Sequence, residues 1–256
     1  MTSNVDASTP SHDSLFEVRD LSVFHGQLCA VDNVSFSVGR GEVLAMIGAN
    51  GAGKSTLLRT IAGLHQASSG TIVFAGQDVS KSAPHRRVAL GISLVPEGRR
   101  LFSSMTLEEN LQVGAHFAKK GPFSIARIYE LFEWMPDRRR QRVGLFSGGE
   151  QQAVAIGRAL VTNPQLLMLD ELSLGLAPIV IERIYALLPE IVSEGIGVLL
   201  VEQDVTQAMA VADRVHCLLE GKTSLIGTPA ELTSQQIERA YFGSDLSGTA
   251  AHGGAA

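Results

Sequence analysis

The spacing of hydrophobic positions changes along the chain, and each spacing predicts a different kind of element. In the first third, apolar runs rich in Val, Ile and Phe are punctuated by glycine, which is typical of β-strands. A helix beginning near Lys54 interrupts these runs. The expected strands cover residues 15–24, 30–38, 42–47 and 71–74.

Between Thr106 and about Met135 the apolar residues recur at helical intervals. The sequence TLEE at 106–109 is a capping box, which opens one of these helices. After Ser147 helices and strands alternate, and this order predicts a parallel sheet with helices packed against it. The expected elements are a helix over 150–162, a strand over 165–169, a helix over 178–194, a strand over 197–202, a helix over 204–212 and a strand over 214–219.

The two ends of the chain differ in composition from the rest. Residues 1–14 are polar and residues 244–256 are small and rich in Gly and Ala, so both are expected to be disordered tails of a folded domain over 15–243. A last helix is expected to start at Thr228, because Pro229 then takes the favoured first helical position.

Composition and charge narrow the class of protein. The 256 residues are 45% hydrophobic and 18% charged, which excludes a disordered chain or a small disulfide scaffold. The net charge of −5 argues against a nucleic-acid backbone as the main partner, because such domains carry a basic excess. The first residues lack a signal-peptide pattern, and no apolar run approaches the ~20 residues that span a bilayer. Cys29 and Cys217 lie in apolar runs, which favours free thiols in a reducing compartment and leaves one disulfide as an open alternative.

A phosphate-binding pattern follows the strand over 42–47. The segment GANGAGKST matches GxxxxGK[ST] and opens a helix, so its backbone N–H groups and the helix N-terminus can surround an anion. Lys54 would place a positive charge on the β- and γ-phosphates, and the Ser55 hydroxyl would contact Mg²⁺. The alternative is an ordinary glycine-rich turn. The predicted nucleotide-binding residues here are Gly48, Ala49, Asn50, Gly51, Ala52, Gly53, Lys54, Ser55 and Thr56.

A strand ending in two carboxylates forms the second motif. The apolar run LLML is followed by Asp170 and Glu171, at the strand end where open α/β sheets bind ligands. Asp170 would hold Mg²⁺ through water, and Glu171 would accept a proton from the attacking water or orient it. A strand ending in Asp is common by itself. Together with the phosphate-binding loop, it predicts a nucleoside-triphosphate hydrolase.

The sequence FSGGEQQ at 146–152 precedes a helix and lies about twenty residues before the acidic strand. With the two earlier motifs in this order, the chain resembles the ATP-binding cassette ATPases, whose signature is LSGGQ. The resemblance implies an α/β P-loop cassette with a mixed or parallel sheet core, an N-terminal antiparallel β-subdomain and a helical subdomain over about 99–162. It also implies that the signature segment closes on ATP held by a partner subunit in a head-to-tail dimer. The signature residues are Ser147, Gly148, Gly149 and Glu150.

The same resemblance assigns roles to residues outside these motifs. Ser173 and Gly175 match the D-loop that lines the dimer seam, with Leu172 where the family usually has Pro. Glu97 stands where most cassettes have a Gln that senses Mg²⁺ and water, and it is still an oxygen ligand.

Two further positions depart from the family pattern. Gln203 stands at the place of the switch His; it can hydrogen-bond the γ-phosphate or the water but cannot take up a proton. His25 occupies the place of the aromatic residue that stacks on adenine, where a weaker stacking is expected.

The chain resembles the ATP-binding subunits of branched-chain amino-acid importers in its signature and in the segments VPEGRRLF, SLGLAP and VEQD. Amide and urea importers share much of this pattern. The resemblance implies an ATPase that uses ATP and Mg²⁺, on the cytoplasmic side and peripheral to the membrane. Its implied partners are a second cassette, either a copy or a sister chain, two membrane permease subunits and, indirectly, an extracytoplasmic substrate-binding protein. An exporter ATPase and a cassette acting on nucleic acid or the ribosome are the alternatives. The basic run at 138–142 is interpreted as a solvated face, with a lipid or partner contact as the alternative.

Overall fold

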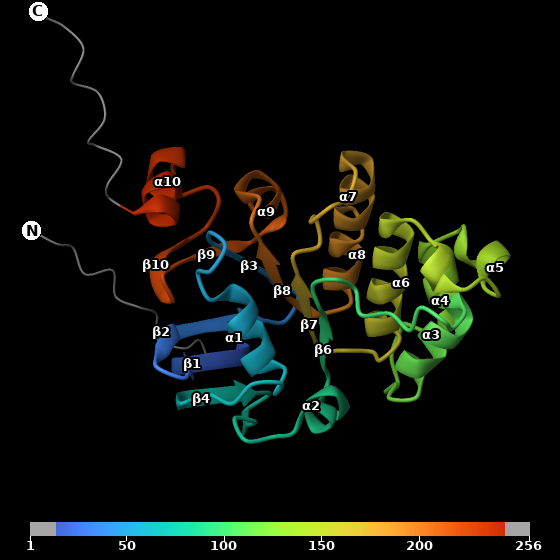
Figure 1. The fold of residues 1–256 in the computed structure, drawn as a ribbon, viewed down its shortest axis with the longest axis horizontal. Coiled ribbons are helices and arrows are strands. Elements are labelled where there is room, and N and C mark those ends of the chain that lie inside the picture. The colour runs from blue at the N-terminus through green and yellow to red at the C-terminus, as the bar shows by residue number, and fades with distance from the viewer. Residues whose placement is uncertain (1–13, 244–256) are drawn as a thin grey trace, which may run out of the picture.

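The computed structural model describes residues 14–243, which form two β-sheets and the helices packed against them (Figure 1). The first sheet is antiparallel and has the strand order β2-β1-β4-β5. Its apolar residues alternate with polar ones, as in a sheet that packs on one face only. The strands are β1 Ser14–His25, β2 Leu28–Gly39, β4 Ser69–Phe74 and β5 Gln77–Asp78.

The second sheet has six strands in the order β10-β9-β3-β8-β7-β6. Five of them are parallel, and β10 pairs antiparallel with β9 at one edge. Every residue of β3, β7 and β8 is buried, as expected for parallel strands covered on both faces. The strands are β3 Val43–Ile47, β6 Ile92–Val95, β7 Leu166–Asp170, β8 Gly197–Glu202, β9 Arg214–Leu219 and β10 Lys222–Gly227.

Helices cover both faces of the six-stranded sheet. On one face, α1 (Lys54–Ile61) lies between the two sheets and contacts both. Its buried leucines join Leu44 and Met46 of β3 in one apolar cluster with the antiparallel sheet. On the other face, α9 (Val205–Val211) and α10 (Ser234–Phe242) cover Ala45 and Ile47 of the same strand. The second helix of the chain, α2 (Pro84–Leu90), leads into β6.

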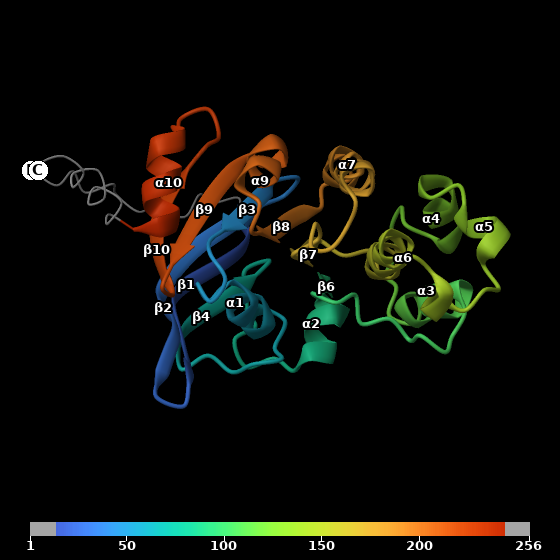
Figure 2. The same cartoon turned by 45° about the horizontal axis from the view of Figure 1, so that its top comes forward.

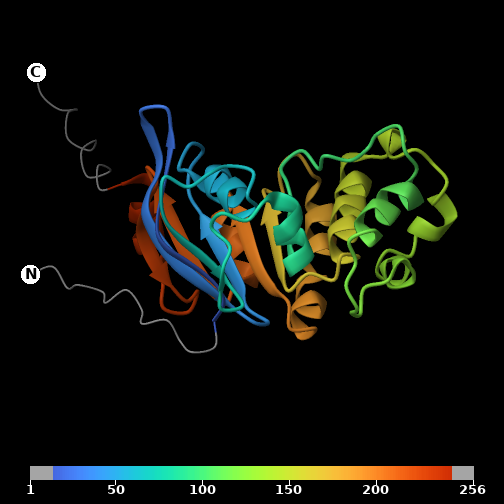
Figure 3. The same ribbon diagram turned by 90° about the horizontal axis from the view of Figure 1, so that it is seen from below.

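A group of helices forms the opposite end of the molecule from the antiparallel sheet (Figures 2 and 3). The predicted capping box is present, since Thr106 and Glu109 bond each other's backbone N–H groups at the start of α3. A Cβ at Gly114 would lie 2.2 Å from the Arg158 carbonyl oxygen, so this glycine allows α3 to pack closely on α6. The helices are α3 Leu107–Ala115, α4 Ile125–Leu131, α5 Met135–Arg138, the 3₁₀ turn η1 Val143–Leu145 and α6 Gly148–Leu160.

Most expected elements are confirmed to within a few residues, but the C-terminal half differs in two places. The single helix expected over 178–194 is two helices, α7 (Pro178–Tyr185) and α8 (Leu188–Ser193). Pro189 lacks the N–H that a continuous helix needs at this point. The helix expected from Thr228 is wrong: Thr228 and Glu231 bond each other in a turn, and α10 begins only at Ser234.

Ser14, predicted to belong to the N-terminal tail, is the first residue of β1. The rest of the two predicted tails, 1–13 and 244–256, lies outside the described residues. The thiols of Cys29 and Cys217 are both free, so the disulfide alternative is excluded in this structure. Across the described range, no helix combines the length and the apolar character needed to cross a membrane.

Candidate functional site

The loop between β3 and α1 requires glycine at two places. A Cβ at Gly53, where φ is +101°, would lie 2.2 Å from the carbonyl oxygen of Ala30. A Cβ at Gly48 would lie 2.4 Å from the carbonyl oxygen of Leu218. Both distances are impossible for real atoms, so the loop can pass between β2 and β9 only with glycine here. It reaches α1 with the unpaired N–H groups of the helix start open to an anion.

Lys54, the first residue of α1, is only 4% exposed. Its ammonium donates hydrogen bonds to the carbonyl oxygens of Gly48 (2.6 Å) and Ala49 (3.1 Å), and lies 3.8 Å from Glu171. Burial lowers the pKa of Lys54, while the charges of Glu171 and Asp170 oppose this effect. An ammonium group buried beside the loop can attract the negatively charged oxygens of a polyphosphate.

Asp170, at the carboxyl end of β7, faces the start of α1. Its Oδ1 lies 3.4 Å from the Ser55 hydroxyl, and its side chain is buried. Burial and the neighbouring charge of Glu171 together raise the pKa of Asp170 to about 6. These oxygens fit a hard cation such as Mg²⁺, whose charge would compensate the buried carboxylate. Within residues 14–243, no group of three or more His, Cys, Asp or Glu side chains is arranged to hold a metal ion.

Glu171 directly follows β7 in a left-handed backbone conformation, with φ of +48°. Such a conformation is strained for a residue with a Cβ and persists only where the surroundings hold it. One of these supports is the hydrogen bond from the Glu171 N–H to the Val201 carbonyl of β8 (2.9 Å). The carboxylate lies near Lys54 at the mouth of the site, and Gln203 follows the end of β8 on the same side.

A cavity of about 640 Å³ brings most of the predicted site residues together. It lies between the loop after β3, the β1–β2 turn and the carboxyl ends of the parallel strands. Six further residues outside the predicted site, among them Glu220 and Gly221 after β9, complete the wall. The predicted residues that line it are His25, Asn50, Gly51, Gly53, Lys54, Ser55, Thr56, Glu97, Glu171 and Gln203.

The predicted adenine-stacking residue lies at the rim of this cavity. His25 Nε2 is 3.3 Å from the Thr56 hydroxyl, and its ring lies against that of His65, with 4.5 Å between ring centres. His65 comes from the loop after α1 and was not predicted from the sequence. The two rings form an aromatic edge beside the phosphate-binding loop.

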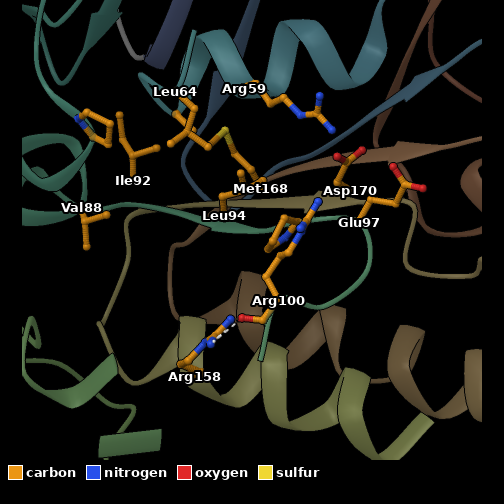
Figure 4. A pocket seen from close by; sticks show the side chains of 13 residues that line it. Arg59, Leu64, Val88, Ile92, Leu94, Glu97, Arg100, Arg158, Met168 and Asp170 are labelled. Carbon is orange, nitrogen blue, oxygen red and sulfur yellow. Dashed lines mark hydrogen bonds between the residues drawn. The ribbon is translucent and has the colours of Figure 1, made fainter. Parts of the chain in front are cut away.

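A neighbouring cavity of about 560 Å³ shares Glu97 and reaches Asp170 (Figure 4). Below it, Arg158 of α6 donates hydrogen bonds to the carbonyl oxygens of Arg99 (3.1 Å) and Arg100 (3.0 Å). Both of these residues have positive φ, 64° and 45°. Arg158 therefore holds the strained turn that follows Glu97 and ties it to α6.

The signature segment forms the start of α6. Ser147 is the N-cap, and it forms a capping box with Glu150, whose carboxylate also binds Arg138. The Arg138 guanidinium lies over the Phe146 ring, 4.3 Å from its centre. Arg138, the first residue of the basic run, is therefore partly exposed and bound to the signature, while residues 139–142 are exposed, as predicted for a solvated face. A Cβ at Gly149 would lie 2.5 Å from Val180, which explains the glycine there.

The signature does not reach the nucleotide-sized cavity of its own chain. Ser147, Gly149 and Glu150 line a different cavity of about 680 Å³ beside α7, and Gly148 lies against Arg99. The D-loop residues lie closer to the first cavity: Leu174, between Ser173 and Gly175, is half exposed and lines it. The signature residues therefore line a cavity other than the one beside Lys54.

Comparison with known proteins agrees with this geometry. A family model described as ABC transporter matches residues 31–173. The chain is 44% identical over 226 residues to the high-affinity branched-chain amino acid transport ATP-binding protein BraG of Pseudomonas aeruginosa, covering 87% of this chain and 97% of that protein. It is 33% identical to the probable branched-chain amino acid transport ATP-binding protein LivF of Archaeoglobus fulgidus, over 84% of this chain and 93% of that one. A solved ATP-binding cassette of an ABC transporter in its ADP conformation superposes with a TM-score of 0.76 at 27% identity, covering 91% of this chain and 96% of the other.

Proposed function

Since this chain belongs to the ABC transporter family of ATP-hydrolysing cassettes, we propose that it is the ATPase subunit of an importer for branched-chain, hydrophobic amino acids. The observation that carries the proposal is the convergence of Lys54, Ser55 and Glu171 on one cavity, with Asp170 behind them. The solute is proposed from the relatives, because the cassette itself does not contact it.

The reaction is phosphoryl transfer from ATP to water. Oxygen of the water attacks the γ-phosphorus, the bond to the ADP oxygen breaks, and a proton of the water passes to Glu171. Lys54 and the loop N–H groups stabilise the charge on the phosphates. Gln203 hydrogen-bonds the γ-phosphate or the water, and His25 stacks on the adenine.

Ser55, Asp170 and Glu97 are the residues that would hold Mg²⁺. When bound, this ion neutralises charge on the β- and γ-phosphates. The fit is supported by the oxygen donors and by the raised pKa of Asp170, which a cation would bring down again.

The quaternary arrangement follows from the signature. Ser147, Gly148, Gly149 and Glu150 would close on ATP bound by a second cassette, in a head-to-tail dimer with Ser173 and Gly175 along the seam. The dimer would sit on the cytoplasmic face of the membrane, against two permease subunits that receive the solute from an extracytoplasmic binding protein. No nucleic-acid partner is proposed.

The transport function is tested by uptake of labelled leucine in cells whose chromosomal copy of the gene is replaced by a variant. Lys54→Ala should abolish uptake. Lys222→Ala, which removes an exposed lysine of β10, should leave uptake unchanged. Normal uptake with Lys54→Ala as the sole copy would refute the proposal.

A further inference from the structure

Glu202 is the last residue of β8 and immediately precedes Gln203. Its side chain is fully buried, with 0% exposure. Burial of a carboxylate is unfavourable unless hydrogen bonds or an ion pair compensate it. None of the ion pairs in the described part of the chain includes Glu202. Its direct partners are therefore hydrogen-bond donors, and the Lys54 charge acts on it from a longer distance.

The carboxylate accepts hydrogen bonds from two residues on separate elements. Oε1 accepts from the Ser173 backbone N–H (3.1 Å) and from the Tyr185 hydroxyl (2.6 Å), and Oε2 accepts from the Ser173 hydroxyl (2.7 Å). Ser173 belongs to the loop after β7, and Tyr185 is the last residue of α7. Burial and the charge of Glu202 raise the pKa of Tyr185, so its hydroxyl remains a donor at neutral pH.

These contacts lie directly beside the proposed catalytic carboxylate. Glu171 is held in its left-handed conformation by the bond from its N–H to Val201, on the strand residue before Glu202. Two residues further along, Ser173 is held by Glu202 itself. Neighbouring residues of β8 thus fix the turn on both sides of Glu171.

We propose that Glu202 is a positioning residue that, through Ser173, holds the Glu171 turn and the start of the D-loop in the geometry needed for hydrolysis. This inference rests on the proposed function. Glu202 does not face the nucleotide cavity, and its effect on the reaction passes through Ser173 and Glu171. The residue links the strand that leads to Gln203 with the loop that carries Glu171.

The test compares four variants of the full chain. Glu202→Ala removes all three acceptor contacts, and Tyr185→Phe removes one donor with little change of shape. Glu202→Gln removes the charge but keeps an acceptor for the Ser173 N–H. Tyr129→Phe is the matched control, because the Tyr129 hydroxyl is also buried and has no hydrogen-bond partner among the described residues. The measurements are kcat, affinity for a non-hydrolysable ATP analogue with Mg²⁺, and hydrogen exchange of the peptide containing Ser173.

We expect Glu202→Ala to lower kcat about 10- to 100-fold and Tyr185→Phe about 3- to 10-fold, as loss of hydrogen bonds to a charged group implies. Affinity for the analogue should stay within about threefold, since these residues do not touch nucleotide. Glu202→Gln should recover much of the activity lost in the alanine variant, and Tyr129→Phe should stay within about twofold of wild type. Hydrogen exchange of the peptide containing Ser173 should be faster than in wild type only for Glu202→Ala and Tyr185→Phe.

A kcat within twofold of wild type for Tyr185→Phe, with unchanged exchange at Ser173, overturns the inference even if Glu202→Ala does not fold. Equal losses of analogue affinity and kcat also overturn it, because they indicate a general structural defect. Absence of hydrolysis by the wild-type chain would instead refute the proposed function, and the exchange data would then report separately on whether Glu202 holds Ser173.

Discussion

Replacing Asp170 by asparagine should stabilise the protein at neutral pH while it removes a residue proposed to hold Mg²⁺. The pKa of Asp170 is raised from 3.8 to about 6 because the carboxylate is buried beside Glu171. The folded protein therefore binds the proton more tightly than the unfolded chain does. The contribution of Asp170 to the free energy of unfolding therefore falls as the pH rises from about 4 to about 6, and the loss is complete above that range. A shift of this size corresponds to about 3 kcal/mol.

Asparagine cannot ionise, yet it retains an oxygen that can accept from the Ser55 hydroxyl. In EDTA and without nucleotide, Asp170→Asn should raise the free energy of unfolding at pH 7 by up to about 3 kcal/mol, and the gain should vanish near pH 4. Urea unfolding at both pH values measures the difference. Asp137→Asn, which changes an exposed carboxylate of α5, should alter stability by less than about 0.5 kcal/mol at either pH.

The same variant should lose the stabilisation that Mg²⁺ with ADP gives to the wild-type chain, because one proposed ligand of the ion is weakened. A less stable Asp170→Asn protein at pH 7, or a gain that persists unchanged at pH 4, would refute the electrostatic reasoning. Unaltered stabilisation by Mg²⁺ and ADP would refute the assignment of Asp170 to the ion.

Two other predictions concern the loop and the sheet. Gly53→Ala should lower ATP affinity more than tenfold in a binding titration, because the new Cβ would overlap the Ala30 carbonyl oxygen. Gly76→Ala, also at positive φ but in open space, should leave ATP affinity within twofold of wild type. Equal effects of the two substitutions would show that the overlap with Ala30 is not the cause. Burial and, to a smaller extent, the charge of Arg214 lower the pKa of His216 to about 4. Protons therefore bind the unfolded chain preferentially, and the free energy of unfolding should fall by up to about 3 kcal/mol as the pH drops from 6.5 to 4. Urea unfolding of His216→Leu should show a flatter dependence over this range, and an unchanged slope would exclude His216 as its source.

Local patterns along the chain were sufficient to predict the glycine-rich loop before α1 and the strands around it. The GxxxxGK[ST] spacing depends on a turn closed within nine residues, and six of these residues line one cavity. The capping-box pattern predicted α3 correctly, whereas the similar pattern at Thr228 closes only a turn. The side-chain bonds are alike in the two places. After Thr106, however, Leu107 and Leu111 are fully buried, whereas Leu232 after Thr228 is only partly buried.

Contacts between distant segments had no comparable signal. Nothing in the sequence pairs Glu202 with Tyr185, which lies seventeen residues earlier in another element. The hydrogen bond from Arg158 to the carbonyl oxygen of Arg99 joins residues 59 positions apart in the sequence. Such pairs follow from the tertiary arrangement of α6, α7 and β8, so they could be found only once the fold was known.

We propose that ATP is hydrolysed in the cavity beside the loop after β3, with Glu171 as the proton acceptor. The most direct test is the rate at which the purified full chain releases phosphate from ATP in the presence of Mg²⁺. This rate is compared between wild type, Glu171→Gln and Glu130→Gln, a control at an exposed carboxylate. We expect Glu171→Gln to lower this rate at least about 100-fold while ATP affinity is retained, and we expect no loss for the control. A Glu171→Gln rate within threefold of wild type would contradict it.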